Sequence, residues 1–383
     1  MSTSTQQRIA SKLLIVFLAV VSVITIAIQQ ADSAGITVYK EGDKYVKLGG
    51  RIQFQYHYKD PDSGGASDSV FFRRLRPYIK GSLHKDWTGK FQWDMGKNEV
   101  AVKDAYIQYT GFKDMKVSVG NANFPFSREY LTSSKKQQLV ERTFVGDHNY
   151  GTLARNAGVH ITGHFADKKV TYGISGASAS IDPDAEKLDF DTPVNRNSDF
   201  NEGWIIGGRA DFHPFGEIKM SQGDFNGKTR AAIGVAAFRW NNDGDNNTSG
   251  TKPDVDSVTG LEVSSAIRSN GLSVDGEYNM FDADTVDSAV TKGIYRNGNT
   301  KLKNFALEGG YMLIGDKLEI VAGYQVQDAD NYDTKWNRTS FGANWFFKKH
   351  DIKTQLTYQL GKNLKGVRDS DENELFVQMQ YVF

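Results

Sequence analysis

The chain contains no cysteine among its 383 residues and only 7 prolines. The missing cysteines exclude a disulfide framework, a zinc site with thiolate ligands and a cysteine nucleophile. An excess of charge of one sign is also lacking, because 46 lysines and arginines stand against 46 aspartates and glutamates. Without an overall basic character the chain has no electrostatic footprint for nucleic acid, and we do not expect nucleic acid as a partner.

A long apolar run occurs only once, near the N-terminus. Arg8 and Lys12 precede the uncharged stretch 13–28, and small residues follow it. A basic start, an apolar core and small residues at its end are typical of a secretory signal peptide. We predict that residues 1–33 are such a peptide and that cleavage follows Ser33. The alternative is a membrane anchor helix, because the stretch approaches the roughly 17 residues that span a bilayer.

The end of the chain has a strict alternation. Leu375, Val377, Met379, Tyr381 and Phe383 alternate with the residues between them up to the last position. A period of two indicates a strand with one apolar face. Soluble domains rarely end in this way, because their termini usually fray. This ending resembles the outer-membrane assembly signal, with Phe383 at the terminus and Tyr381 two positions before it, so we expect the barrel-assembly machinery as a partner.

The same alternation recurs along the chain and predicts about 16 strands. The expected spans are 45–58, 70–83, 88–96, 100–110, 115–122, 154–165, 169–178, 203–213, 228–240, 259–269, 271–281, 302–313, 317–327, 337–348, 351–361 and 374–383. A soluble β-sandwich would also alternate, but it would bury its apolar face against a second sheet. A sandwich would need neither an export signal nor an aromatic terminus.

The predicted connections alternate between long polar loops and tight turns, which is the arrangement of outer-membrane barrels. Two connections depart from it: a short loop at 97–99 and a long turn at 214–227. The fold class is therefore an all-β, transmembrane antiparallel β-barrel of about 16 strands at 45–383, which follows a periplasmic lead-in at 34–44. We expect it in the bacterial outer membrane, in contact with outer-membrane lipid and lipopolysaccharide.

An ordered set of motifs resembles the phosphate-selective porin O/P family over nearly all of the mature chain. The set comprises Phe72-Arg73-Arg74-Leu75-Arg76 with Gly81, Lys103-Asp104-Ala105-Tyr106, Gly120, Pro125-Phe126-Ser127, Thr132-Ser133-Ser134, Glu141-Arg142, Arg155 with Gly158, Gly276-Glu277-Tyr278 and Gly342-Ala343-Asn344-Trp345. The resemblance implies a trimer of 16-stranded barrels, with loops folded into each pore and anions led along arginines and lysines. The chain has Asn123 where the family often carries a lysine, so the preferred anion stays open.

The candidate ion path lies on the polar sides of the first two predicted strands and includes one carboxylate from the fourth. Its members are Lys47, Arg51, Arg74, Arg76, Lys80 and Asp104. Guanidinium groups present a fixed fork of donors that matches phosphate or sulfate oxygens. Alternatively, these arginines pair with carboxylates and only brace the wall of the barrel.

The long loop 123–153 is the candidate constriction. A loop of this length without its own secondary structure is usually functional. It carries a basic set that consists of Arg128, Lys135, Lys136 and Arg142. The alternative is an exposed surface loop.

These patterns predict an outer-membrane porin with a water-filled channel for small anions, including phosphate or polyphosphate. Two alternatives stay open: a non-selective general diffusion porin, and a plugged structural or adhesive barrel. We expect no enzymatic activity, because no motif selects a serine–histidine pair. We also expect no cofactor and no metal site, since the seven histidines show no metal-ligand spacing.

Overall fold

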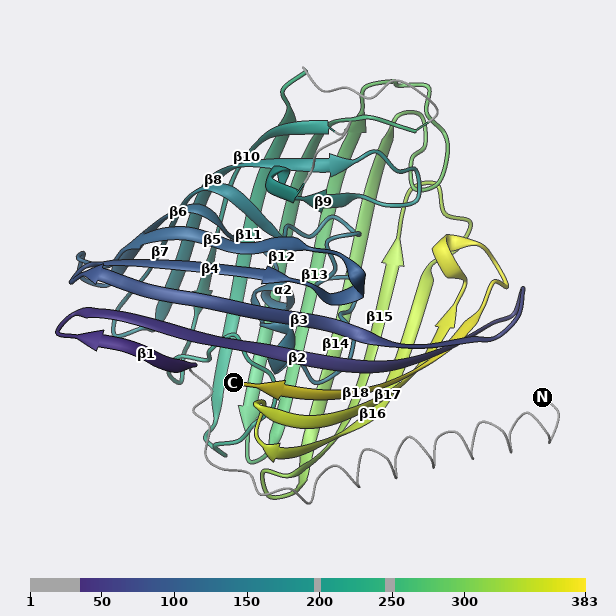
Figure 1. Ribbon diagram of the computed structural model, residues 1–383. Coiled ribbons are helices and arrows are strands. Elements are labelled where there is room, and N and C mark those ends of the chain that lie inside the picture. The colour runs from purple at the N-terminus through teal and green to yellow at the C-terminus, as the bar shows by residue number, and fades with distance from the viewer. Residues whose placement is uncertain (1–34, 196–200, 245–251) are drawn as a thin grey trace.

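The computed structural model describes residues 35–195, 201–244 and 252–383 (Figure 1). The predicted signal peptide 1–33, together with the alternative of an anchor helix, lies outside the described residues. In the part of the chain that the structure describes, no helix has both the length and the apolar character needed to cross a membrane.

Sixteen antiparallel strands form one closed barrel, in which β8 pairs with β10 and β18 returns to pair with β2. The first half consists of β2 (Lys44–Pro61), β3 (Ser67–His84), β4 (Trp87–Asp94), β5 (Ala101–Tyr109), β6 (Met115–Asn123), β7 (Arg155–Phe165), β8 (Val170–Asp182) and β10 (Asn201–Phe212). The second half consists of β11 (Arg230–Asn242), β12 (Val255–Ser269), β13 (Leu272–Thr285), β14 (Asn299–Ile314), β15 (Leu318–Asp328), β16 (Trp336–Lys348), β17 (Ile352–Lys362) and β18 (Glu372–Val382). The prediction of a 16-stranded barrel is confirmed, and every predicted strand end lies within four residues of the observed one.

Two further strands lie outside this ring. Strand β1 (Ile36–Glu41) pairs with the start of β2, so the predicted lead-in at 34–44 itself contains a strand. Strand β9 (Asp189–Asp191) belongs to the loop between β8 and β10 and pairs with the end of β8. The helical elements are single turns: η2 (Gly96–Asn98), α2 (Arg128–Leu131), η3 (Ser134–Lys136), η4 (Pro193–Asn195) and η5 (Leu364–Gly366).

The C-terminal residue takes part in closing the barrel. The Phe383 amide donates to the Gly50 carbonyl over 3.1 Å, and the Gly50 amide donates to the Phe383 carbonyl over 2.9 Å. The Tyr381 and Phe383 rings stack with centroids 6.0 Å apart. The strand that carries the predicted assembly signal therefore leaves no open edge beside β2, as a sheet in a bilayer requires.

The two faces of the barrel wall differ in the way that the alternation predicts. On the outer face, apolar side chains such as Val235 and Phe341 are about half exposed. On the inner face, polar side chains such as Gln53, Asn304 and Asn344 are fully buried. Their burial shows that chain segments fill much of the lumen.

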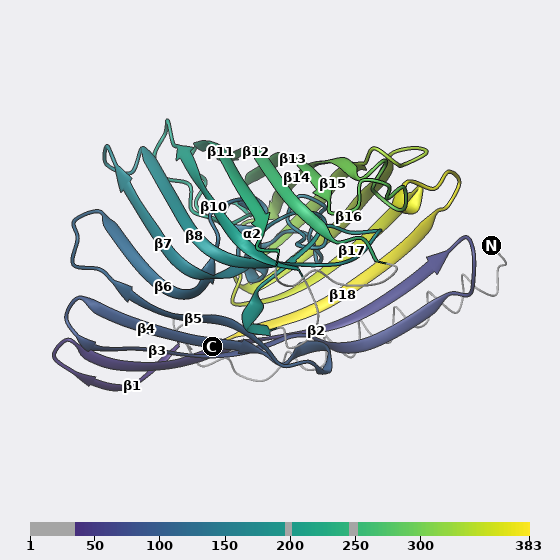
Figure 2. The same cartoon turned by 90° about the horizontal axis from the view of Figure 1, so that it is seen from above.

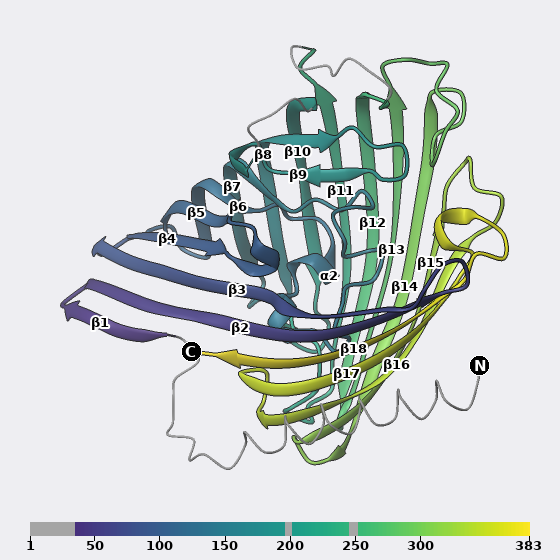
Figure 3. The same ribbon diagram turned by 45° about the vertical axis from the view of Figure 1, so that its right-hand side comes forward.

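The main filling segment is the connection between β6 and β7, residues 124–154, which carries α2 and lies inside the ring of strands (Figures 2 and 3). Its Phe126 packs on Phe238 of β11 and Phe281 of β13, with ring centroids 4.9 and 5.8 Å apart. Phe124 joins the same buried apolar cluster. The segment is therefore held against the wall that contains β10–β14, and we call it the infolded segment.

Candidate functional site

A cavity of about 920 Å³ lies between the infolded segment and the wall formed by β2–β5. Twelve cationic side chains line it: Arg51, Arg73, Arg74, Arg76, Lys80, Lys90, Lys97, Lys103, Lys135, Arg142, Arg155 and Arg338. Seven carboxylates face them: Asp94, Glu99, Asp104, Glu141, Asp147, Asp191 and Glu374. The cavity therefore carries an excess of five positive charges, whereas the whole chain is neutral.

A β-bulge explains why two consecutive arginines face this cavity. In the pairing of β2 with β3, Gln53 opposes Arg74 and Phe54 opposes Phe72, which leaves Arg73 as the extra residue. A bulge lets neighbouring side chains point to the same face of a sheet. Arg73 and Arg74 therefore both line the cavity. Phe72 lies on the outer face and packs on Phe54, with ring centroids 5.4 Å apart.

This bulge corrects one expectation. A strict alternation along the predicted strand 70–83 places Phe71 on the lipid side, together with Leu75 and the later apolar residues of the strand. Because the bulge shifts the register, Phe71 opposes Gln55 and lines the cavity.

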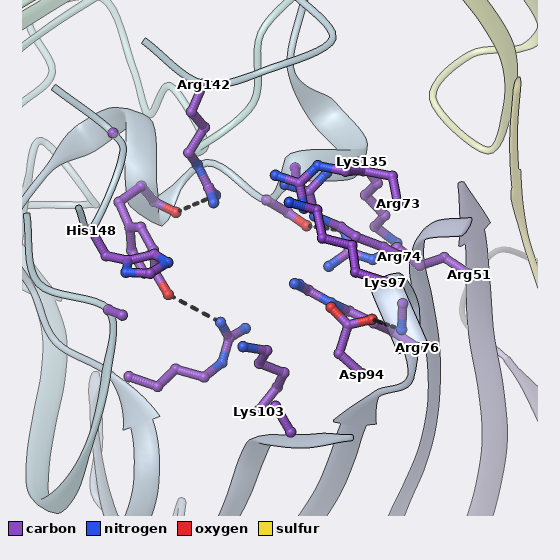
Figure 4. A pocket seen from close by; sticks show the side chains of 18 of the residues that line it. Arg51, Arg73, Arg74, Arg76, Asp94, Lys97, Lys103, Lys135, Arg142 and His148 are labelled. Carbon is purple, nitrogen blue, oxygen red and sulfur yellow. Dashed lines mark hydrogen bonds and ion pairs between the residues drawn. The ribbon is translucent and has the colours of Figure 1, made fainter. Parts of the chain in front are cut away.

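A second bulge adds another cation from β5. Gln92 of β4 opposes Asp104, and the next residue, Trp93, opposes Val102, so Lys103 is the extra residue. Lys103 and Asp104 therefore both line the cavity. Figure 4 shows the β2–β3 arginines gathered on one side of the cavity, with Lys103 apart from them.

Some of the cavity cations are neutralised by carboxylates. Arg76 donates to Asp94 over 2.6 Å. The Asp104 carboxylate forms ion pairs with both Lys90 and Arg155. These pairs brace the wall, as the alternative interpretation expected.

Other cations in the cavity make no ion pair among the described residues. The Arg51 side chain donates only to the Ser133 hydroxyl, over 3.2 Å, and the Arg74 side chain only to the side-chain oxygen of Gln53, over 3.0 Å. The Nε atoms of both arginines are buried without a hydrogen-bond partner. Lys103 and Lys135 have no carboxylate within ion-pair distance in the same described part of the chain. A buried cation without a counter-charge is costly, so these groups favour the entry of an anion.

Glu141 joins the infolded segment to strand β3 of the cavity wall. Arg73 donates to both oxygens of this carboxylate, over 2.6 and 2.8 Å. Burial opposes ionisation of Glu141, but the Arg73 guanidinium outweighs burial and holds the pKa of this carboxyl well below its ordinary value. On the opposite side of the cavity from the β2–β3 arginines, Arg142 donates to the Tyr130 and Thr132 carbonyls (Figure 4).

The structure brings seven of the ten predicted ion-path and constriction residues into this one cavity. They are Arg51, Arg74, Arg76, Lys80, Asp104, Lys135 and Arg142. Three do not line it: Lys47, Arg128 and Lys136. Lys47 lies opposite Lys80 near the start of β2, and the carbonyl of Lys136 is bound by the turn between β10 and β11.

Arg128 lies against β13, away from the ion path predicted along the first strands of the barrel. It is 2% exposed and donates to Asp275 of β13 over 3.1 Å. This arginine therefore anchors the infolded segment to the wall behind it, which corrects its assignment to the constriction.

Several cations that line the cavity are missing from the predicted ion path and constriction, including Arg73, Lys90, Lys97, Lys103, Arg155 and Arg338. For Arg73 a signal was present, because two apolar residues followed by two arginines cannot fit a strict alternation. Arg155 and Lys103 stand inside motifs that carried the family resemblance, so that resemblance could have pointed to them.

Comparison with known proteins gives a consistent result. The family described as phosphate-selective porin O and P matches residues 46–383. An uncharacterized protein of Aquifex aeolicus (strain VF5) is 25% identical over 375 residues, which cover 88% of this chain and 86% of that protein.

Solved structures share the fold at low sequence identity. The anion-selective porin from Comamonas acidovorans is 12% identical, with a TM-score of 0.58 over 89% of this chain and 100% of that chain. The trimer form of OmpT from Vibrio cholerae is 13% identical, with a TM-score of 0.53 over 88% of this chain and 99% of that chain. Because the family match spans most of the chain, this outer-membrane porin belongs to the phosphate-selective porin O and P family.

Proposed function

We propose that this porin conducts small anions, phosphate among them, through the cavity between β2–β5 and the infolded segment. The observation that carries the proposal is the excess of five positive charges along this cavity in a chain whose total charge is neutral. Selectivity depends on charges at the narrow part of a pore, because external charges are screened within about 8–10 Å at physiological salt.

The pairing of the cations supports the same proposal. Arg51 and Arg74 line the cavity and have no carboxylate partner among the described residues, and each donates one side-chain hydrogen bond, which leaves further guanidinium N–H donors. A transient anion can accept hydrogen bonds from these donors and replace part of its lost hydration. The carboxylates of the cavity, such as Asp94, keep their own cations engaged, which limits how tightly an anion is held.

The test is the reversal potential of single channels in a planar bilayer under a salt gradient. We expect the wild type to favour chloride over potassium, and added phosphate to block its chloride current. The variant Arg51→Gln with Arg74→Gln should lose much of both effects. The control Lys317→Gln with Lys349→Gln removes the same charge from two exposed turns outside the cavity and should behave as wild type.

The outcomes separate the alternatives. A cation-selective wild type contradicts the proposal, and an unselective one favours a general diffusion porin. A protein that inserts but never conducts favours a plugged barrel. An anion-selective wild type without phosphate block keeps the anion channel and removes phosphate preference, which is the result that Asn123 in the cavity wall would explain.

We also infer that the protein is not an enzyme and that it assembles as a homotrimer. The two histidines of the cavity, His57 and His148, bond to the carboxylates of Glu374 and Asp189 and not to a serine. The trimer form of the structurally similar OmpT supports the oligomeric state. Lipopolysaccharide around the barrel, and recognition of the strand ending in Tyr381 and Phe383 by the assembly machinery, complete the proposed set of partners.

A further inference from the structure

The turn between β10 and β11, residues 213–229, differs from the other connections at the same end of the barrel. Those connections contain between two residues, at 270–271, and five, at 110–114. Within the long turn, Ile218 and Gln222 are 5% and 1% exposed. The middle of the turn, around residues 218–224, therefore folds into the barrel from the short-turn end, while positions on either side of it stay exposed.

Gln222 lies at the centre of this inward fold. Its amide donates to the Lys136 carbonyl over 3.0 Å, and its side-chain oxygen accepts from the Gln138 amide over 2.7 Å. Its side-chain nitrogen donates to the Glu308 carboxylate of β14, and its carbonyl accepts from His350 over 2.8 Å. A single residue of the turn thus joins the infolded segment to the barrel wall.

Other contacts fix the turn independently of Gln222. The Asp224 carboxylate accepts from the amides of Asn226 and Gly227 within the turn, and from the Gly271 amide of the neighbouring turn over 2.9 Å. Arg268 of β12 donates to the Ser221 carbonyl over 2.7 Å. The backbone on both sides of Gln222 is therefore held in place by hydrogen bonds that do not involve Gln222 itself. A positioning residue requires such a rigid support.

The part of the infolded segment that Gln222 holds carries a cation of the cavity. Lys135 precedes the bound residues 136–138 directly and lines the cavity on the side of Arg51 (Figure 4). The Lys135 carbonyl is bound in turn by Gln380 of β18 over 3.0 Å. The backbone around Lys135 is thus held from β18 on one side and from the long turn on the other.

We propose that the turn 213–229 is a second pore-shaping segment and that Gln222 is the positioning residue that fixes Lys135 beside Arg51 in the channel. The inference rests on the proposed anion channel and adds to it that the constriction is set from the periplasmic end as well as by the infolded segment. Gln222 acts through Lys135 and does not touch the anion.

The experiment is a double-mutant cycle on selectivity, measured as the reversal potential of the full-length porin in a planar bilayer. The variants are Gln222→Ala, Lys135→Gln and the pair. The matched control is Asn226→Ala, an exposed position of the same turn. We expect Gln222→Ala to lower the chloride-over-potassium ratio by about twofold, Asn226→Ala to leave it unchanged, and Gln222→Ala to add nothing in the Lys135→Gln background, because coupled residues are not additive.

The results separate this inference from the proposed function. A wild type without anion preference overturns both. An anion-selective wild type whose Gln222→Ala variant is equally selective overturns only the role of Gln222, and so does an effect of Gln222→Ala that persists in full without Lys135. Gln222→Met, which keeps the side-chain volume, replaces the alanine variant if that variant does not reach the membrane.

Discussion

The two halves of the lumen are built in opposite ways. The half beside β2–β5 is open, holds an excess of cations and contains arginines, such as Arg74, that have no carboxylate partner in the described part of the chain. The half beside β10–β15 is filled, and its charges are buried in direct contact. There Arg209 donates to Asp211 and Glu262, and Arg268 pairs with Asp275.

This difference shows that charge alone does not identify an ion path inside a barrel. Buried charges need partners, because desolvation without compensation is costly. Arg128 and Arg142 belong to the same infolded segment, yet Arg128 pairs with Asp275 of the wall behind it, while Arg142 lines the cavity. Pairing and the wall that a side chain faces decide which cations can meet an anion.

The halves should differ most in their tolerance of a one-residue deletion. Deleting Arg73 removes the extra residue of a bulge, so the residues on both sides keep their faces. Deleting Ala266 from the regular pairing of β11 with β12 turns every residue on one side of the deletion to the opposite face. We expect outer-membrane levels roughly tenfold lower or worse for the Ala266 deletion, and near wild type for the Arg73 deletion.

Heat-modifiable electrophoretic mobility of membrane fractions measures the folded barrel for both deletions. The Arg73 deletion should also lose anion selectivity, because it removes the contact with Glu141. If it fails to assemble as completely as the Ala266 deletion does, the extra residue is not accommodated by the bulge.

The same bulges mark the limit of what the sequence could predict. The number of strands and their faces follow from the alternation, because each strand has one side in lipid and one in the lumen. A strict alternation places Phe71 on the wrong face, because a bulge leaves no mark other than a local break in the pattern. The place of Arg128 depends on the carboxylate of Asp275, which is far from it in the sequence. The long turn 214–227 stood out as an exception, but only its contacts show that it enters the barrel.

A second difference between the halves concerns stability. Arg209→Met leaves the Glu262 carboxylate buried without its cation and leaves Asp211 only the Arg128 guanidinium at 4.0 Å, and such losses cost about 3–5 kcal/mol. Arg74→Met leaves only the side-chain oxygen of Gln53 without its hydrogen-bond donor. We therefore expect a loss of roughly 1 kcal/mol in the free energy of unfolding. Urea titration of both refolded variants in detergent or lipid measures the free energies of unfolding. Equal losses would show that the two halves do not differ in how their charges are held.

The smallest expected effect concerns Glu129, which holds the infolded segment to the filled half. Its carboxylate accepts from the Thr143 amide over 3.0 Å and from the Thr143 hydroxyl. Its amide donates to the Glu277 carboxylate of β13 over 2.8 Å. A small cavity of about 10 Å³ beside it is also lined by Arg128, Gln222, Asp275, Glu277 and Glu308. Within the infolded segment, Arg142 favours and Asp147 opposes the ionised form of Glu129.

Burial raises the pKa of Glu129 to about 7, against the opposing effect of the bonds from Thr143. Because docking raises the pKa of the Glu129 carboxyl, protonation of this carboxyl favours the docked state. The infolded segment should therefore be held most firmly when the pH is below 4.5, the ordinary pKa of the carboxyl. This contribution to docking should be lost as the pH rises to about 7. Because the filled half leaves no room, a loosened segment can move only toward the channel. We therefore expect brief closures to be more frequent at pH 8 than at pH 5, because deprotonation of Glu129 weakens the docking of the segment. The variant Glu129→Gln should show less of this change. His57 and His148 are present in both proteins, so the difference between them in single-channel traces isolates Glu129. The same pH dependence in both proteins would assign it to the channel half instead.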